Sequence, residues 1–315
     1  MVSHDPWRFV ACHFYRPLSY PSSPWRFWSP RCNSFFVISG FVIPYSFSRA
    51  GQDWRLSTFM LKRFIRLQPP FLAACMLVAA LNLASKHMPG YTGSLEGTYL
   101  RDSLFQLLTD NLYVSGLMGR SWILVVAWTL AIEVQFYLVA GLTKHWLNVR
   151  PFLLLMSVIV ASLVLRQSGL IFHWLPIFTL GTLAAVRLPV WCWRDMAIAG
   201  FVLLLIAYTF SPTEALFAGC SLTMVVMTVQ GWLPRIPLMA WLGSISYSLY
   251  LVHVPIGGRV VNLAARFNPS PLQQLIACIL GTLTSIAGAW LFWRLIEQPS
   301  HQWSRRSSDG RPPVP

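Results

Sequence analysis

The stretch FFVISGFVIPYSFSRAGQDWRLSTFMLKRFIRLQPPF, residues 35–71, decides the fold class of this chain. An apolar run at 35–47 is followed by a basic segment and then by a second apolar run at 71–84. The basic segment carries five cations, which are Arg49, Arg55, Lys62, Arg63 and Arg66. This pattern is typical of two membrane helices joined by a cytoplasmic loop, because Lys and Arg resist translocation during insertion.

The basic segment has two interpretations that the residues alone leave open. It sets the membrane topology, or Arg63 and Arg66 hold a phosphorylated cofactor through forked, charge-assisted hydrogen bonds. We expect Pro69 and Pro70 to open the second helix, since the missing N–H of proline is tolerated in a first turn.

Composition supports a membrane protein and argues against a nucleic-acid-binding one. The 315-residue chain is 55% hydrophobic and only 11% charged, whereas soluble domains average about 25% charged residues. The net charge is +14, but the basic residues cluster between apolar runs, so we attribute the charge to topology and expect no nucleic acid partner. The cysteines show neither CxxC nor metal-ligand spacing, so we expect no metal.

We expect an all-α polytopic bundle of about nine transmembrane helices, although several apolar runs are shorter than the roughly 20 residues that a span needs. The expected helices cover 35–48, 69–85, 121–142, 151–165, 169–186, 196–211, 215–233, 238–257 and 272–295. The segment 103–117 suits a re-entrant or interfacial helix. We expect a single membrane domain at 35–300, preceded by a non-helical or disordered segment at 1–34 and followed by a disordered cytoplasmic tail at 301–315.

Glu133 is the first candidate for chemistry, because it stands in the apolar segment SWILVVAWTLAIEVQFYLVAGL at 121–142. A carboxylate inside a membrane helix is costly and is a functional candidate by default. A structural acid paired with a buried Arg or hydroxyl is the alternative. In either case we expect the side chain to face the interior of the bundle.

His253 is the second candidate, in the polar helix segment GSISYSLYLVHVPI at 243–256. At 3.6 residues per turn, Ser246, Tyr250 and His253 share one face, with Tyr247 close to it. That face suits a wet cavity in which a histidine acts as a general base near neutral pH. The alternative is a histidine satisfied between helices. We interpret Glu297, beside Arg294 and His301, as part of an ion cluster at a helix end.

Five segments in order resemble the acyltransferase 3 family of integral-membrane O-acyltransferases. They are FFVISGFVI at 35–43, FMLKRFIRLQPPF at 59–71, AWTLAIEVQFYL at 127–138, GSISYSLYLVHVPI at 243–256 and WRLIEQPS at 293–300. The resemblance implies a bundle of about ten helices of membrane-spanning length. It also implies transfer of an acyl group, acetyl in particular, from acyl-CoA to a hydroxyl of a sugar or cell-envelope glycan.

The resemblance also implies site residues and a cellular location. Arg63 and Arg66 match the family's Arg-x-x-Arg motif, which is associated with the cytoplasmic acyl-donor side. Glu133 and His253 match its Trp-x-Leu-x-x-Glu and Tyr-Leu-x-His patterns, which we take as catalytic. We expect an integral protein of the bacterial inner membrane, surrounded by lipid, with a cytoplasmic C-terminus.

The N-terminal segment departs from the family pattern. The family's first helix begins near an Arg and carries an essential His about three helical turns later. Arg8 matches that beginning, but counting on reaches Ser19, and the prolines at 17, 21, 24 and 30 oppose a helix. The segment reads either as an out-of-frame translation that rejoins the family at Phe35 or as a divergent terminus. We therefore keep two alternatives to an active enzyme, which are an inactive family member and a transporter of a charged metabolite.

Overall fold

The computed structural model describes residues 32–49, 54–85, 100–118, 120, 122–124, 126–165, 171–188, 191–234, 236–265, 267 and 270–309. The expectations for the N-terminal segment therefore lie almost wholly outside the described residues, as does the end of the tail beyond 309. The described residues form two compact units. Unit 1 comprises those within 61–127 and from 236 onward, and unit 2 comprises those up to 60 and within 128–235.

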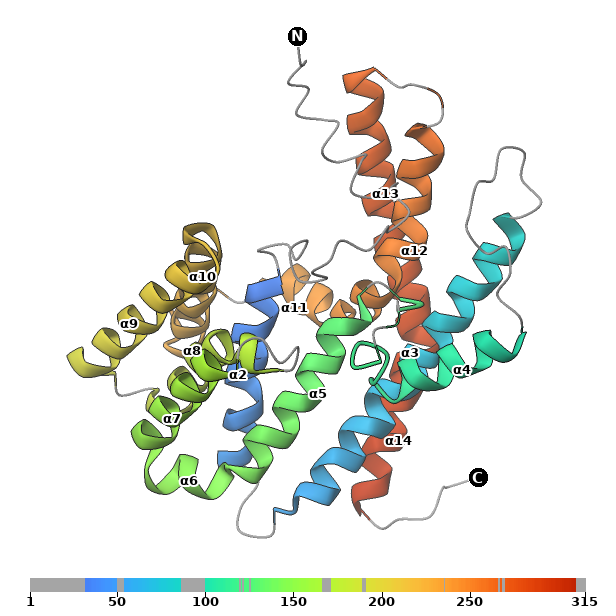
Figure 1. Ribbon diagram of the computed structural model, residues 1–315. Coiled ribbons are helices and arrows are strands. Elements are labelled where there is room, and N and C mark those ends of the chain that lie inside the picture. Colours follow the sequence, from blue (N-terminus) through green and yellow to red (C-terminus); the bar gives the residue numbers. More distant parts are fainter. Residues whose placement is uncertain are drawn as a thin grey trace. The chain divides into compact units, whose positions relative to one another are not determined.

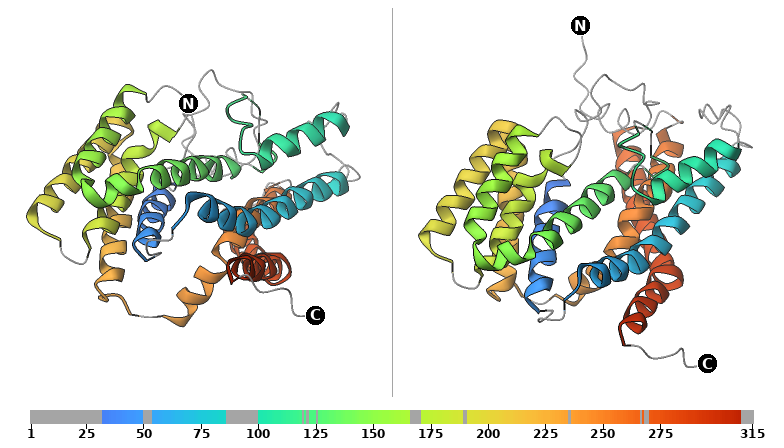
Figure 2. Two further views of the ribbon diagram at one scale, coloured as in Figure 1. Left: turned by 90° about the horizontal axis from the view of Figure 1, so that it is seen from below. Right: turned by 60° about the horizontal axis from the view of Figure 1, so that its bottom comes forward.

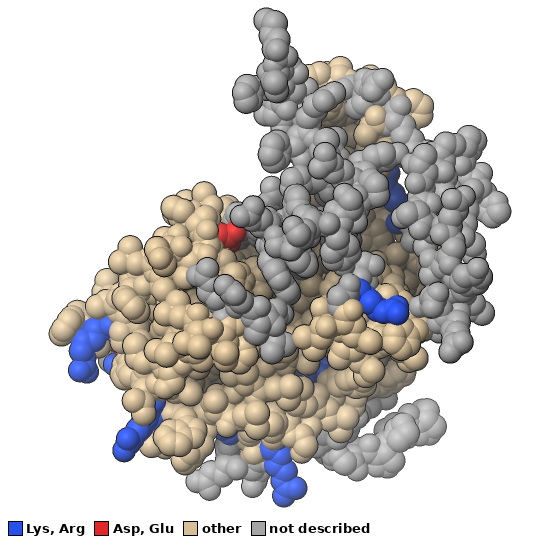
Figure 3. Space-filling view, in the orientation of Figure 1, with Lys and Arg blue, Asp and Glu red and all other residues tan. Residues whose placement is uncertain are grey.

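Helices make up the secondary structure of the described residues, which contain no strand. Among these residues, three stretches are long and apolar enough to cross a membrane, namely Leu56–Leu81, Pro212–Val229 and Pro271–Ser304. Shorter apolar helices lie at Cys32–Phe47, Ala127–Leu142, Pro151–Val164 and Leu175–Arg187. The described part of the surface in Figure 3 is mostly uncharged. The expected all-α membrane bundle is confirmed.

Unit 2 is a bundle in which helix α8 has the most neighbours. Its elements are α2 (Cys32–Arg49), most of α5 (Ala127–Leu142), α6 (Lys144–Val149), α7 (Pro151–Val164), the 3-10 turn η2 (Ile171–His173), α8 (Leu175–Arg187), α9 (Trp193–Thr209) and α10 (Pro212–Val229). Helix α8 packs against α2, α7, α9 and α10 (Figure 1). All of its residues from 175 to 184 are buried. This burial is expected for a helix that is mostly apolar on every side.

Two glycines set the close approach of α2 and α8. A Cβ added to Gly40 would overlap the carbonyl oxygen of Phe178, and one added to Gly181 would overlap that of Val37. The hydroxyl of Thr182 donates to the carbonyl oxygen of Gly40 across the same contact, at 3.2 Å. The two backbones therefore touch here, and the rotation of α2 about its axis is fixed.

Unit 1 is organised by a pair of helices that lie side by side, α12 and α13 (Figures 1 and 2). Its elements are α3 (Leu56–Ser85, from residue 61), α4 (Leu100–Asn111), α11 (Pro237–Ser244), α12 (Ser246–Ala265), α13 (Pro271–Phe292), the π-helical turn η3 (Trp293–Glu297) and α14 (Gln298–Asp309). Gly257 and Gly281 allow α12 and α13 to touch, since a Cβ on Gly257 would overlap the hydroxyl oxygen of Ser285.

Two expected boundaries are wrong. The second membrane helix does not begin at Pro69, because α3 starts at Leu56 and carries Pro69 and Pro70 inside it. The cations at 62, 63 and 66 are therefore helical rather than part of a loop. The expected helix 238–257 is divided at Ile245 into α11 and α12. At this break Ser244 and Ser246 donate to nearby backbone carbonyls, a local bonding that competes with helix continuation.

Other differences are smaller. Helix α5 begins at Ala127 rather than at 121, because the N–H of Ile123 donates to the carboxylate of Asp110 at 2.7 Å instead of entering a helix. Helix α4 covers 100–111, and its following turn includes Tyr113 at a positive φ of 58°. Helix α14 runs to Asp309, within the segment that we expected to be a cytoplasmic tail.

Candidate functional site

The paired arginines lie in unit 1 on one face of α3. Arg63 and Arg66 are three residues apart, so their side chains leave the helix in similar directions. Both side chains are half-buried, whereas Lys62 beside them is exposed. A pair of guanidinium groups on one helix face matches the geometry of phosphate oxygens, which accept forked hydrogen bonds.

Three other helices of unit 1 fix the backbone around this arginine turn. The hydroxyl of Ser304 in α14 donates to the carbonyl oxygen of Lys62 at 3.0 Å. The phenol of Tyr247 in α12 donates to the carbonyl oxygen of Leu67 at 2.9 Å. Gln68 donates to the backbone and side-chain oxygens of Asn111 in α4, at 2.8 and 2.7 Å. These contacts hold the turn at both of its ends. The two prolines that follow in α3 lack the N–H groups that a regular helix uses for hydrogen bonds.

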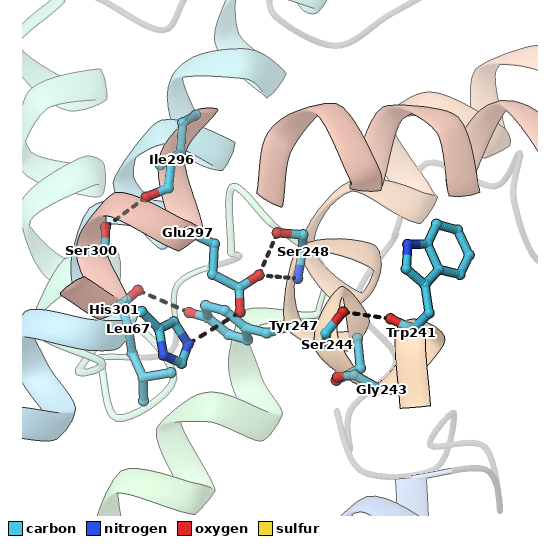
Figure 4. A network of polar contacts seen from close by, with 11 residues as sticks. Leu67, Trp241, Gly243, Ser244, Tyr247, Ser248, Ile296, Glu297, Ser300 and His301 are labelled. Atoms are coloured by element: carbon cyan, nitrogen blue, oxygen red, sulfur yellow. Dashed lines mark hydrogen bonds and ion pairs between the residues drawn. The ribbon is translucent and has the colours of Figure 1, made fainter. Parts of the chain in front are cut away.

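Glu297 anchors the start of α12 in the same unit (Figure 4). Its Oε2 accepts hydrogen bonds from the N–H of Ser248 at 3.1 Å and from the hydroxyl of Ser248 at 2.5 Å. His301 Nε2 lies 3.5 Å from Oε1 of Glu297. Arg294 is exposed, and its guanidinium carbon lies 5.6 Å from the centre of the Trp290 ring. The helix-end cluster that we expected therefore includes His301 and Ser248, and Arg294 stacks on an aromatic ring beside it.

His253 is half-buried on α12, and its Nδ1 lies against backbone carbonyl oxygens of the same helix. Its Nδ1 lies 2.8 Å from the carbonyl oxygen of Tyr250 and 3.0 Å from that of Leu249. Carbonyl oxygens only accept hydrogen bonds, so in the neutral ring the proton resides on Nδ1 and the lone pair on Nε2. The arrangement leaves Nε2 as the nitrogen that is able to take a proton.

Glu133 lies in α5 in unit 2 and is buried, with 8% of its surface exposed. The hydroxyl of Ser39 in α2 donates to Glu133 Oε1 at 3.0 Å. The buried side chains of Trp128 and Tyr137 belong to the same helix. Glu133 thus faces the interior of its unit, as expected for an ionisable group in a membrane helix.

An ionic cluster joins the end of α8 to the start of α9. Arg187 Nε donates to Asp195 Oδ1 at 2.8 Å, and the N–H of Cys192 donates to Asp195 Oδ2 at 2.9 Å. Burial raises the pKa of the Asp195 carboxyl, but the hydrogen bonds from Cys192 and Arg187 outweigh it and lower the pKa below its ordinary value. The capping of α9 by its own Asp195 marks this cluster as a structural element.

Sequence reasoning found the ionisable side chains but missed the partners that hold them. In the sequence, Ser39 is one residue of an apolar run, and Ser248 is one of several hydroxyl residues in a polar helix segment. A serine next to a glycine in an apolar run was the available signal, because small residues mark close helix contacts in membranes. Among the described residues, no three His, Cys, Asp or Glu side chains gather in the way that a metal ion requires.

Comparison with known proteins gives one family match. Residues 10–294 match a family model described as an acyltransferase domain. The match begins within the N-terminal segment that we expected to depart from the family. No curated protein and no solved structure matches the chain. Since the match covers most of the sequence, the chain belongs to the acyltransferase 3 family.

Proposed function

We propose that the chain is a membrane-bound O-acyltransferase that moves an acyl group, acetyl in particular, from acyl-CoA to a hydroxyl of a sugar or cell-envelope glycan. The family match over 10–294 carries this proposal. The apolar helices support an integral membrane location. The bacterial inner membrane is what the family resemblance implies, and the positions of the basic residues favour a cytoplasmic C-terminus. Both belong to the proposal, as does the surrounding lipid as partner.

The proposed reaction is attack of an alcohol on a thioester. The acceptor oxygen bonds to the acyl carbon, the bond between that carbon and the CoA sulfur breaks, and the sulfur leaves as a thiolate. The proton of the hydroxyl passes to a base on the protein and then to the sulfur, so that an ester and free CoA result. This chemistry needs a positioned base and a site for the charged donor, and no redox step.

Arg63 and Arg66 are the proposed donor-binding residues. Two half-buried cations on one face of α3 suit the phosphate groups of CoA, and the contacts from Tyr247, Ser304 and Gln68 keep the turn rigid. A rigid turn loses less conformational freedom when the donor binds, so more of the interaction energy appears as affinity.

Glu133 and His253 are the proposed catalytic residues. The position of Nδ1 against two carbonyl oxygens favours His253 as a base, because the neutral ring then keeps its lone pair on Nε2. Glu133 supplies a buried carboxylate that is able to accept a hydrogen bond or a proton from a hydroxyl.

The test is acyl transfer by the purified protein in detergent. The protein is incubated with acetyl-CoA labelled in the acetyl group and with a mixed glycan acceptor, and both free CoA and labelled ester are measured. Formation of both products above the level of a Glu133→Gln, His253→Gln double variant supports the proposal. Absence of both, together with uptake of a charged metabolite into liposomes, favours a transporter, and absence of all three favours an inactive relative.

A further inference from the structure

We propose that Ser39 is the positioning residue that holds the carboxylate of Glu133, an inference that rests on the proposed function for the catalytic role of Glu133. The Ser39 hydroxyl donates to Glu133 Oε1 at 3.0 Å, across 94 positions of sequence. Ser39 and Glu133 are 7% and 8% exposed, so bulk water does not replace this donor readily.

The backbone of α2 places Ser39 with little freedom. Gly40, the next residue, lies against the backbone of α8 at Phe178, and Gly181 of α8 lies against Val37. Thr182 adds a hydrogen bond to the carbonyl oxygen of Gly40. A helix that touches its neighbour through backbone atoms resists rotation, so the Ser39 hydroxyl keeps one direction.

The surroundings of the pair are aromatic. The ring of Phe36, one turn before Ser39, lies 4.9 Å from that of Phe178 and 6.0 Å from that of Trp128, between ring centres. Phe136 of α5 stacks on Phe178 with 4.2 Å between ring centres. In such an apolar setting a hydrogen bond to a carboxylate is electrostatically stronger than the same bond in water.

The role that follows is orientation rather than chemistry. Ser39 holds one carboxylate oxygen of Glu133 in place, and this also fixes the direction in which the other oxygen points. A catalytic group that is misplaced by about 1 Å can lose 10²-fold in rate, so a fixed carboxylate is worth more than a rotating one. The sequence Ser39-Gly40 in α2 thus combines a close helix contact with a donor to the buried acid.

The first test observes the carboxylate without any reaction. Infrared spectra of the purified protein are compared with those of Glu133→Gln, and the carboxylate band that disappears is assigned to Glu133. Ser39→Ala and Ser39→Cys are expected to shift this band, since a thiol is a weak donor. Ser34→Ala is the matched control, because Ser34 lies on the same helix but accepts from Ser221. An unshifted band in both Ser39 variants overturns the proposal.

The second test measures the consequence for catalysis. Ser39→Ala should lower kcat by about 10- to 100-fold, the range for removing a hydrogen bond to a charged group, with little change in the KM of the donor. In a Glu133→Gln background the same change should have no further effect. An equal loss in both backgrounds means a merely structural role and overturns the proposal, as does an unchanged kcat. If the wild-type protein transfers no acyl group, the proposed function fails, and the infrared test alone decides whether Ser39 holds Glu133.

Discussion

Glu297 accepts two hydrogen bonds from Ser248, one from its backbone N–H at 3.1 Å and one from its hydroxyl at 2.5 Å. Ser248 lies in the first turn of α12, where N–H groups lack partners within the helix. A carboxylate at that position also complements the helix dipole. The next residue back, Tyr247, reaches Leu67 beside the arginine turn. The end of η3 therefore holds α12, and α12 in turn braces α3.

Replacing Glu297 should destabilise unit 1. Glu297→Ala leaves the N–H and hydroxyl of Ser248 buried without their acceptor, which costs about 1–3 kcal/mol. Glu297→Gln keeps one oxygen acceptor and should lose less. Unfolding midpoints in detergent measure the effect, and Gln302→Ala, at an exposed position on the following helix, is the control. A midpoint for Glu297→Ala equal to that of Gln302→Ala would contradict the capping role.

The α2–α8 contact should not tolerate a methyl group. Gly40→Ala forces the new Cβ onto the carbonyl oxygen of Phe178, so a backbone must move, at a cost of about 1–3 kcal/mol or more. Gly200→Ala in α9 is the matched control, because nothing lies within 4 Å of a Cβ there. It should stabilise its helix slightly, since alanine has the higher helix propensity. Equal unfolding midpoints of the two variants would show that the contact does not form.

Asp195 should stabilise the protein in a pH-dependent way. Its folded-state pKa is lower than its ordinary value of about 4, so the ionised carboxylate stabilises the fold above that pH. The contribution is lost as the pH falls through the folded-state pKa. The gap in unfolding midpoint between wild type and Asp195→Asn should therefore be full at pH 7 and shrink on acidification. A gap that widens as the pH falls would show that folding raises the pKa of Asp195 instead of lowering it.

The fold class was predictable from sequence because it depends on bulk hydrophobicity, which is a sum over many residues. The start of α3 was not predictable in the same way. The local sequence predicts a loop at Lys62, Arg63 and Arg66, but these residues are helical. Contacts from α4, α12 and α14 stabilise the helix next to its two prolines. Tertiary contacts decided this boundary against the local pattern.

The candidate site was predictable only in part, for a related reason. Glu133 is conspicuous because a charge in an apolar helix is rare. Ser39 is inconspicuous because a serine costs little in such a helix, and its contact with Glu133 depends on how α2 and α5 pack. A single sequence shows which residues are unusual, but it does not show that two residues 94 positions apart are in contact.

If the N-terminal segment departs from the family pattern as we expect from its sequence, the chain should show weak activity. The resemblance implies a base on a first helix, which we expect the prolines at 17, 21, 24 and 30 to disfavour. Positioned general-base catalysis contributes roughly 10²–10⁴-fold. A chimera with a family-like first helix and its His should therefore release CoA at least about 100-fold faster than the present chain. The same chimera with that His replaced by Ala is the control. A chimera that gains nothing would overturn this explanation.

Binding of acetyl-CoA tests the central claim most directly, because it does not depend on turnover. Affinity is measured by titration of the purified protein in detergent, for the wild type and for Arg63→Ala with Arg66→Ala. Charge-assisted hydrogen bonds to phosphate predict a loss of at least about 10-fold. Arg55→Ala with Lys62→Ala removes the same charge from exposed positions and should bind like the wild type. Unchanged affinity in the Arg63, Arg66 variant, or an equal loss in the control, would contradict the assignment of this turn to the acyl donor.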